Sequence, residues 1–433
     1  MSQKDKESPS MPSKEATRTP SEAESKDEFQ QKSRKPATES DWKSLSQILV
    51  SFLLAFNTWG LVNSYGVYQT YYATSGVLGD VTQSQLSWIG SVQAFLILVT
   101  LIVTGPLFDR GYARSLSYFG SFLVVFGMMM TSLARRYWQL LLSQGFCIGF
   151  GHGCLFIVVV GQVSLTFKRR RWMAMGLAQS GGSVGAIVYS IIFREIQPRA
   201  GAPWATRAVG FIALATLSLA RALLRPHKLE KPRNVFDARA FKNKPFNAFA
   251  LASFTGFMGL YIPFFYIQQY TTHHAGANSD LAFYTLAILN AGSVIGRVVP
   301  GFIADQVGLL NTYTASTVGA TILAFAWIAC RNMGGIIAFA IIYGFFAGCA
   351  AALQPAVLAS LCSEANLVGT WVGMGSLFSS TGLLLGNPLG GQIFRGHDWL
   401  GLQLWCACLV LACAVATGST RVLRAGTRIR SRI

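Results

Sequence analysis

The sequence has 433 residues, of which 52% are hydrophobic and 12% are charged, and its net charge is +18. Soluble globular domains carry about 25% charged residues, so this composition excludes an ordinary soluble fold. The positive charge does not indicate nucleic-acid binding. The excess lies mostly in short segments between long apolar runs, as on the cytoplasmic face of a membrane protein.

The chain begins with a polar tail, residues 1–44, which holds nine Lys or Arg and nine Asp or Glu. The tail has almost nothing to bury, so we expect it to be a disordered cytosolic segment. Twelve apolar runs follow, each with roughly the 20 residues that a bilayer core requires. They cover residues 45–73, 86–108, 115–134, 138–165, 172–194, 205–224, 246–271, 281–303, 311–329, 334–358, 367–394 and 399–419.

The basic residues predict how these runs are oriented. The connections after even-numbered runs, together with the C-terminal tail, hold 18 Lys or Arg, whereas the connections after odd-numbered runs hold five. Basic loops stay in the cytosol, so both termini are predicted to be cytosolic. The predicted domains are the tail 1–44, a six-helix half 45–224, a cytosolic linker 225–245, a second six-helix half 246–419 and a basic cytosolic tail 420–433.

The two halves resemble each other. Gly105-Pro-Leu-Phe-Asp109 and Gly301-Phe-Ile-Ala-Asp305 each end an apolar run, with the two aspartates 196 residues apart. Gly176 and Gly373 open runs of small residues at nearly the same offset. Parallel repeats of six spans with a central site are a known plan for transporters. The sequence therefore predicts an all-α membrane protein with twelve transmembrane helices in two pseudo-symmetric six-helix halves.

Several motifs point to one family. They are Asn63-Ser-Tyr-Gly-Val-Tyr-Gln-Thr-Tyr-Tyr72, Gly105-Pro-Leu-Phe-Asp-Arg-Gly111, Met175-Gly-Leu-Ala-Gln-Ser-Gly181, Gly259-Leu-Tyr-Ile-Pro-Phe-Phe-Tyr-Ile-Gln268 and Gly296-Arg-Val-Val-Pro-Gly301. Together the chain resembles the major facilitator superfamily, and within it the fungal monocarboxylate porter family. The resemblance implies the major facilitator fold and alternating access, with conformational gating roles for Asp109, Arg110 and Asp305.

Two positions depart from the proton-coupled animal members of that family. Those members have a lysine where Asn63 stands and an aspartate where Ser293 stands, although the arginine of the same helix remains as Arg297. The resemblance thus supports transport but not the animal mechanism of proton–lactate symport. A proton is still a candidate coupling ion, and His152 could carry it because histidine titrates near neutral pH. The alternative for His152 is a neutral histidine bonded to a neighbour.

Arg297 is a charge inside a predicted span, and such residues usually face the bundle interior or a water-filled cavity. Its guanidinium can bind a carboxylate through two parallel hydrogen bonds, which favours an anion site. The alternative is a structural lock, in which Arg297 bonds to helix carbonyls. The residues expected to bind the substrate are Arg297, Asn63, Gln69, Gln179, Tyr261, Tyr266, Asn290 and Gln354.

These features predict a secondary transporter that moves a small organic molecule with a carboxylate across the plasma membrane as a multi-pass monomer. A monocarboxylate and a fungal secondary metabolite are both open as substrates, and so are uptake and efflux. A receptor without transport on the same fold is the alternative. No metal-ligand spacing, phosphate-binding loop or nucleophile–base pair is present, so the sequence predicts no cofactor and no enzyme. The expected partners are the lipid bilayer and the substrate, with no nucleic acid.

Overall fold

A computed structural model of the chain describes residues 38–167, 171–225, 237–274, 279–362, 367–394 and 399–426. Residues 44–433 form one compact unit, and residues 1–43 form a separate one. Most of the predicted N-terminal tail, residues 226–236 of the predicted linker and the end of the C-terminal tail lie outside the described residues.

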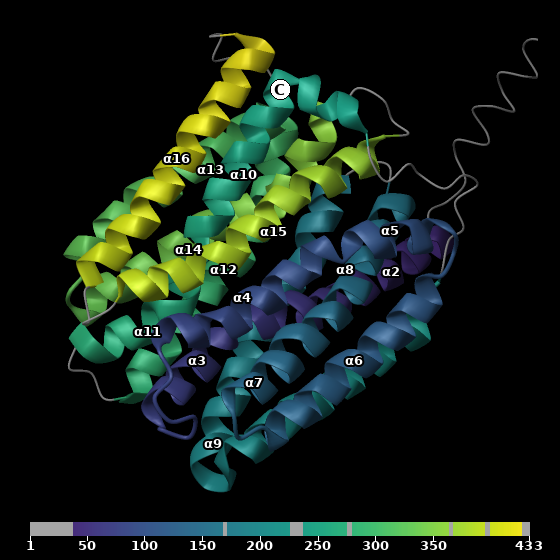
Figure 1. Ribbon diagram of the computed structural model, residues 1–433. Coiled ribbons are helices and arrows are strands. Elements are labelled where there is room, and N and C mark those ends of the chain that lie inside the picture. The colour runs from purple at the N-terminus through teal and green to yellow at the C-terminus, as the bar shows by residue number, and fades with distance from the viewer. Residues whose placement is uncertain are drawn as a thin grey trace, which may run out of the picture. The chain divides into compact units, whose positions relative to one another are not determined.

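The first half consists of helices that run back and forth along one axis (Figure 1). They are α2 (Thr38–Asn63), α3 (Tyr65–Thr74), α4 (Gln83–Val99), α5 (Leu101–Asp109), α6 (Ala113–Leu133), α7 (Tyr137–Leu140), the π-helix η1 (Leu141–Cys147), α8 (Ile148–Thr166) and α9 (Arg171–Leu223). The second half repeats this plan. It contains the 3₁₀ helix η2 (Ala238–Lys242), α10 (Lys244–Leu260), α11 (Ile262–His274), α12 (Ser279–Val307), α13 (Leu309–Ala326), the 3₁₀ turn η3 (Trp327–Ala329), α14 (Met333–Leu361), α15 (Val368–Ile393) and α16 (Trp399–Ala425).

Among the described residues, eleven helical stretches are long and apolar enough to cross a bilayer, against twelve predicted runs. The difference lies in α9, which joins the fifth and sixth runs. Inside α9, Gly201 has φ 82° and ψ 161°, a non-helical conformation that glycine adopts without a steric penalty. This residue lets the chain turn back on itself.

Hydrogen bonds at the C-terminal end of α9 show this reversal. The helix starts just after α8, and it ends where Gln47 of α2 donates to the Leu223 carbonyl at 3.2 Å. Gln162, near the end of α8, donates to the Arg225 carbonyl at 2.7 Å. Both ends of α9 therefore lie at the same end of the bundle, and the described helices make twelve passes.

Three predicted spans are interrupted within the bilayer region. α2 and α3 meet at Ser64, α4 and α5 meet at Thr100, and α10 and α11 meet at Tyr261. Each pair makes one pass, and such discontinuous helices often lie beside the binding sites of transporters.

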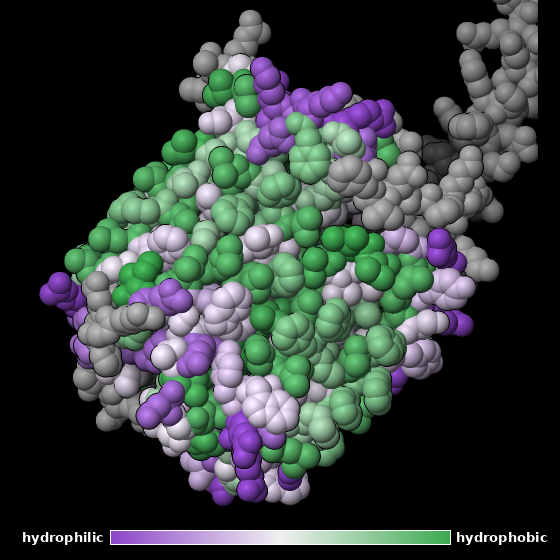
Figure 2. Space-filling view, in the orientation of Figure 1, coloured by the Kyte–Doolittle hydropathy of each residue, from purple (hydrophilic) through white to green (hydrophobic). Residues whose placement is uncertain are grey.

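The outer surface has the pattern expected in a membrane. In Figure 2, hydrophilic residues gather at two opposite ends of the body and hydrophobic residues cover most of the surface between them. Large apolar side chains such as Phe119, Phe122, Ile322 and Val415 are more than half exposed. Exposed apolar area on this scale marks a surface that meets lipid.

We call the end of the bundle where α9 ends and α10 begins the linker end, and the opposite one the far end. The two halves meet where α9 packs on α12, α4 on α15 and α3 on α11. Small residues permit these close approaches. A Cβ atom at Gly176 of α9 would overlap the Arg297 carbonyl oxygen of α12, and one at Gly66 of α3 would lie 2.5 Å from the Phe264 carbonyl oxygen of α11.

Candidate functional site

A cavity of about 520 Å³ lies between the two halves. Its walls come from α2, α4, α5, α8 and α9 of the first half and from η2, α10, α12, α14 and α15 of the second. Residues close to the linker end, such as Phe108, Leu165 and Val368, form its outer part, and Trp59 and Tyr261 lie deeper. The cavity therefore opens toward the linker end and has the size of an ordinary small-molecule site.

Arg297 of α12 is the only charged residue among the described residues that line this cavity. Its side chain is 3% exposed. The Nη1 group donates to the backbone carbonyl of Gln179 on α9 at 3.0 Å, and Nε lies 3.4 Å from the Ser293 hydroxyl. The Ser183 hydroxyl of α9 bonds that same Ser293 hydroxyl at 3.1 Å. Arg297 thus both faces the cavity and connects the two halves.

These bonds include the contact with a helix carbonyl that the structural-lock interpretation requires. They occupy Nε and Nη1, and both partners are neutral. No salt bridge joins Arg297 to an acidic side chain in the described part of the chain. A guanidinium has five N–H donors, so this arrangement leaves hydrogen-bonding capacity and a full charge for a ligand.

Aromatic rings surround the deep part of the cavity beside Arg297. The rings of Trp59 and Tyr261 stack with centroids 5.8 Å apart, and those of Phe257 and Tyr261 stack at 5.9 Å. Phe156 contacts Trp59 edge-on at 5.9 Å. The Tyr261 hydroxyl lies close to the Arg297 guanidinium and is a further neutral partner for it. Stacked rings offer flat apolar faces, so this region suits a flat organic group.

Two amide side chains add polar contacts. Gln179 lines the cavity, and its buried Oε1 atom has no hydrogen-bond partner. Gln354 of α14 also lines it and donates to the Ser379 hydroxyl of α15 at 2.9 Å. Of the eight residues expected to bind substrate, Arg297, Gln179, Tyr261 and Gln354 therefore lie around one cavity.

The other four residues lie outside that cavity. Asn63, Gln69 and Asn290 are buried, and each has side-chain polar atoms without a partner. Tyr266 bonds across to the first half near the far end. Their role as substrate contacts stays a prediction. His152 is fully buried, and neither of its ring nitrogens has a hydrogen-bond partner.

The far end is closed by contacts between the halves. The Tyr266 hydroxyl of α11 lies 2.7 Å from the Ser87 hydroxyl of α4 and donates to the Asn387 carbonyl at 3.3 Å. The Ser84 hydroxyl donates to the Pro388 carbonyl of α15 at 2.9 Å. The rings of Tyr65 and Phe265 lie 5.4 Å apart, likewise across the halves. The protein is thus open at the linker end and closed at the far end.

The predicted gating residues lie at the linker end of their helices. α5 ends at Asp109, and Arg110 follows as an exposed cap residue. Asp305 lies in the last turn of α12. The side chains of both aspartates lie outside the described residues, so their gating role stays a prediction.

Sequence reasoning identified Tyr261 but missed three aromatic members of the site, Trp59, Phe156 and Phe257, and also Phe241, which belongs to the predicted linker. Trp59, Phe156 and Phe257 have no polar atom in an unusual place, so they look like ordinary packing residues in a span. Phe241 carried a usable signal, because it is a large apolar residue in a basic polar segment.

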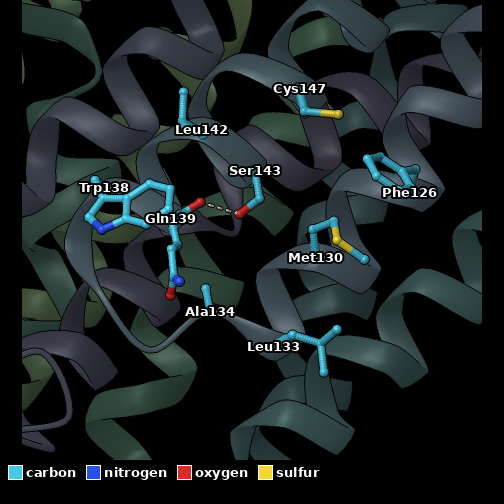
Figure 3. A pocket seen from close by; sticks show the side chains of 9 residues that line it. All are labelled: Phe126, Met130, Leu133, Ala134, Trp138, Gln139, Leu142, Ser143 and Cys147. Atoms are coloured by element: carbon cyan, nitrogen blue, oxygen red, sulfur yellow. Dashed lines mark hydrogen bonds between the residues drawn. The ribbon is translucent and has the colours of Figure 1, made fainter.

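A second cavity of about 390 Å³ is a poorer candidate for the substrate site. Figure 3 shows Phe126, Met130 and Leu133 of α6 on one side of it and Trp138 and Leu142 on the other. All of its lining residues belong to the first half, so movement of one half against the other would not change its access. Within the described residues, no cluster of His, Cys, Asp or Glu could hold a metal ion.

Comparison with known proteins shows which family has this architecture. The family model of the Major Facilitator Superfamily matches residues 45–365. The chain is 40% identical to the MFS-type transporter dbaD of Emericella nidulans, over 83% of this chain and 81% of that protein. It is 35% identical to the aspyridones efflux protein apdF of the same organism, over 82% and 73%. A crystal structure of a mutant of the nucleoside transporter NupG matches with a TM-score of 0.67 at 13% identity, covering 88% of this chain and 99% of that one, and so shares the fold.

Proposed function

Because the chain belongs to the major facilitator superfamily, we propose that this membrane transporter exports a flat organic anion, with Arg297 as the anion-binding group. The observation that carries the proposal is the buried Arg297 guanidinium. It bonds only neutral partners among the described residues and lies beside stacked aromatic rings in a cavity shared by both halves.

The chemistry of the site supports a carboxylate or similar acidic group on the substrate. Two unit charges 4 Å apart at an effective dielectric constant of 20 attract each other by about 4 kcal/mol. Planar N–H groups of arginine match the two oxygens of a carboxylate. The rings of Trp59, Tyr261 and Phe257 would hold the flat apolar part of the same molecule.

Export is the direction that we propose. The basic connections support a cytosolic linker end, so the cavity would receive its ligand from the cytosol. The relative apdF is named as an efflux protein. We further propose that both termini are cytosolic, that the protein acts as a monomer in the plasma membrane, and that a proton drives the exchange between its two conformations.

The experiment that tests the anion site uses a panel of conjugated organic acids, each paired with its methyl ester, on purified protein. Arg297→Gln should weaken binding of the acids by two to three orders of magnitude, the size of about 3–4 kcal/mol of lost attraction. Binding of the esters should change far less. Arg297→Lys keeps the charge but loses the paired donors, so its loss should be about tenfold.

The matched control is Arg199→Gln, which removes an exposed arginine that pairs with Glu195 on the surface. This variant should bind every ligand as the parent does. Equal losses for acids and esters in Arg297→Gln, with a lower melting temperature, would show that Arg297 is a structural lock instead of an anion site.

A further inference from the structure

The end of the predicted linker does not hang free from the bundle. Residues 237–242, which we call the strap, comprise Asp237 and the 3₁₀ helix η2. Ala240 is completely buried, and the backbone carbonyl of Phe241 accepts a hydrogen bond from the Asn247 side chain at 2.6 Å. The Asn243 side chain then caps α10 by accepting from the Phe246 N–H group at 3.1 Å. The strap is therefore a folded, anchored piece of chain.

Asp237 anchors the strap to α15. Its Oδ2 atom accepts a hydrogen bond from the Trp371 indole N–H at 3.2 Å. Its Oδ1 atom accepts from the Arg239 backbone N–H at 3.1 Å and from Arg239 Nε at 3.0 Å. Partial desolvation opposes the charged form, but these donors outweigh it and hold the pKa of Asp237 below its ordinary value. The carboxylate thus stays charged through the neutral pH range.

Aromatic contacts hold Phe241 at the mouth of the cavity. Its ring lies 6.4 Å from that of Phe378 on α15 and 6.3 Å from that of Phe246 on α10. The Phe246 ring in turn contacts Trp371 edge-on at 5.1 Å. Phe241 is itself a lining residue of the cavity, on the same rim as Phe378.

The first half supplies another part of the cavity lining. Ile102, Gly105 and Pro106 of α5 line the cavity there. The described anchors of the strap, by contrast, lie on α10 and α15 of the second half. When the halves move against each other, the strap should therefore move with the second half, carrying Phe241 toward or away from α5.

We propose that the strap spans part of the cavity mouth, that the Phe241 side chain limits the size of the molecules that pass, and that the bond between Asp237 and Trp371 holds it in place. This inference rests on the proposed function, in which the cavity is the route of the substrate. It assigns Phe241 as a specificity-determining residue and Asp237 and Trp371 as positioning residues.

A chemical probe of the mouth tests this without any substrate. Ala351 of α14 lines the cavity, so a cysteine at this position reports what passes the mouth. Ala351→Cys protein is treated with N-ethylmaleimide or with the bulkier N-(1-pyrenyl)maleimide. Native Cys349 and Cys362 lie near this position, so tandem mass spectrometry is used to assign each adduct to residue 351 or to a native cysteine, and the rate at residue 351 is followed separately.

Phe241→Ala should raise the ratio of bulky-reagent to small-reagent rates by about fivefold, the effect of removing an obstacle of about 1 kcal/mol. Trp371→Phe keeps a ring beside Phe246 but removes the donor to Asp237, so the ratio should rise by about twofold. The matched control is Trp405→Phe, which removes an indole N–H that donates to the Gly386 carbonyl at 3.4 Å, away from the strap. It should leave the ratio unchanged.

An unchanged ratio in Phe241→Ala, with cysteine 351 still reactive toward N-ethylmaleimide, would overturn the proposal. An equal rise of the ratio in Trp405→Phe and Trp371→Phe would show that loss of an indole N–H loosens the protein in general, and that the bond to Asp237 has no special role. Reagent access to residue 351 does not depend on transport. The two proposals, on the anion site and on the strap, can therefore be confirmed or refuted independently.

Discussion

Replacing Tyr266 with phenylalanine should shift the protein toward a state in which the far end is open. The Tyr266 hydroxyl bonds Ser87 at 2.7 Å across the two halves, and both side chains are fully buried. A buried hydrogen bond contributes about 1 kcal/mol net, so its loss from the closed state should raise the open population by about fivefold.

The assay is the reactivity of a cysteine placed at Ser91, one helical turn beyond Ser87 on α4 and fully buried in this conformation. Its modification by a water-soluble thiol reagent requires the far end to open, so the rate follows the open population. Ser87→Ala should produce a similar rise. The double variant should show less than the product of the two effects, because both changes remove one shared bond.

Tyr343→Phe is the control for a general loss of stability. The Tyr343 hydroxyl is also buried and donates at 3.0 Å, but to the Leu260 carbonyl within the second half. It should lower the melting temperature without changing reactivity at position 91. Equal reactivity at position 91 in the parent, Tyr266→Phe and Tyr343→Phe would refute the assignment of Tyr266 to far-end closure. Equal increases in the two tyrosine variants would refute it as well.

Three further predictions concern helix packing, topology and gating. Gly176→Ala should destabilise the protein by about 1–3 kcal/mol in thermal unfolding, because the new Cβ meets the Arg297 carbonyl. The control is Gly373→Ala, at the matching place in the second half. A Cβ there has nothing within 4 Å, so this variant should be neutral or slightly stabilising. An impermeant thiol reagent on intact cells should label a cysteine at Ser75 but not at Lys231, and the reverse would invert the topology. Asp109→Asn should slow transport more than it weakens binding, and unchanged turnover would make Asp109 an ordinary surface charge.

The sequence predicted the class of fold well because the bilayer imposes a simple rule. Backbone polar groups must be satisfied inside the membrane, so a run of about 20 apolar residues specifies a helix almost by itself. The twelve predicted runs correspond to the twelve passes of the described helices. The features that the sequence did not predict concern backbone geometry within a helix. Neither the uninterrupted course of α9 up to Gly201 nor the breaks at Ser64 and Thr100 changes the hydrophobic pattern.

Only part of the site could be predicted from the sequence. Arg297 was identified because a charged residue inside a span is costly, and a single such residue can be recognised in the sequence. Which buried amides face the cavity depends on how far one half has rocked against the other, which is a property of a conformation. Gln179 and Asn63 therefore look alike in the sequence, yet they occupy different surroundings. The role of Phe241 depends on the fold of a linker without helical periodicity.

The buried guanidinium also gives the empty protein an electrical character. Among the described residues, Arg297 has only neutral bonding partners, so a bound monoanion would cancel a charge that is otherwise unbalanced in the bilayer region. Moving a full charge through 100 mV changes the free energy by about 2.3 kcal/mol, and rocking of the halves carries Arg297 through a fraction of that field. Membrane voltage should therefore act on the return of the empty protein and leave the loaded step almost unaffected. A change of voltage would therefore alter the turnover rate and, through the fraction of empty protein that faces the ligand, the apparent affinity for the anion.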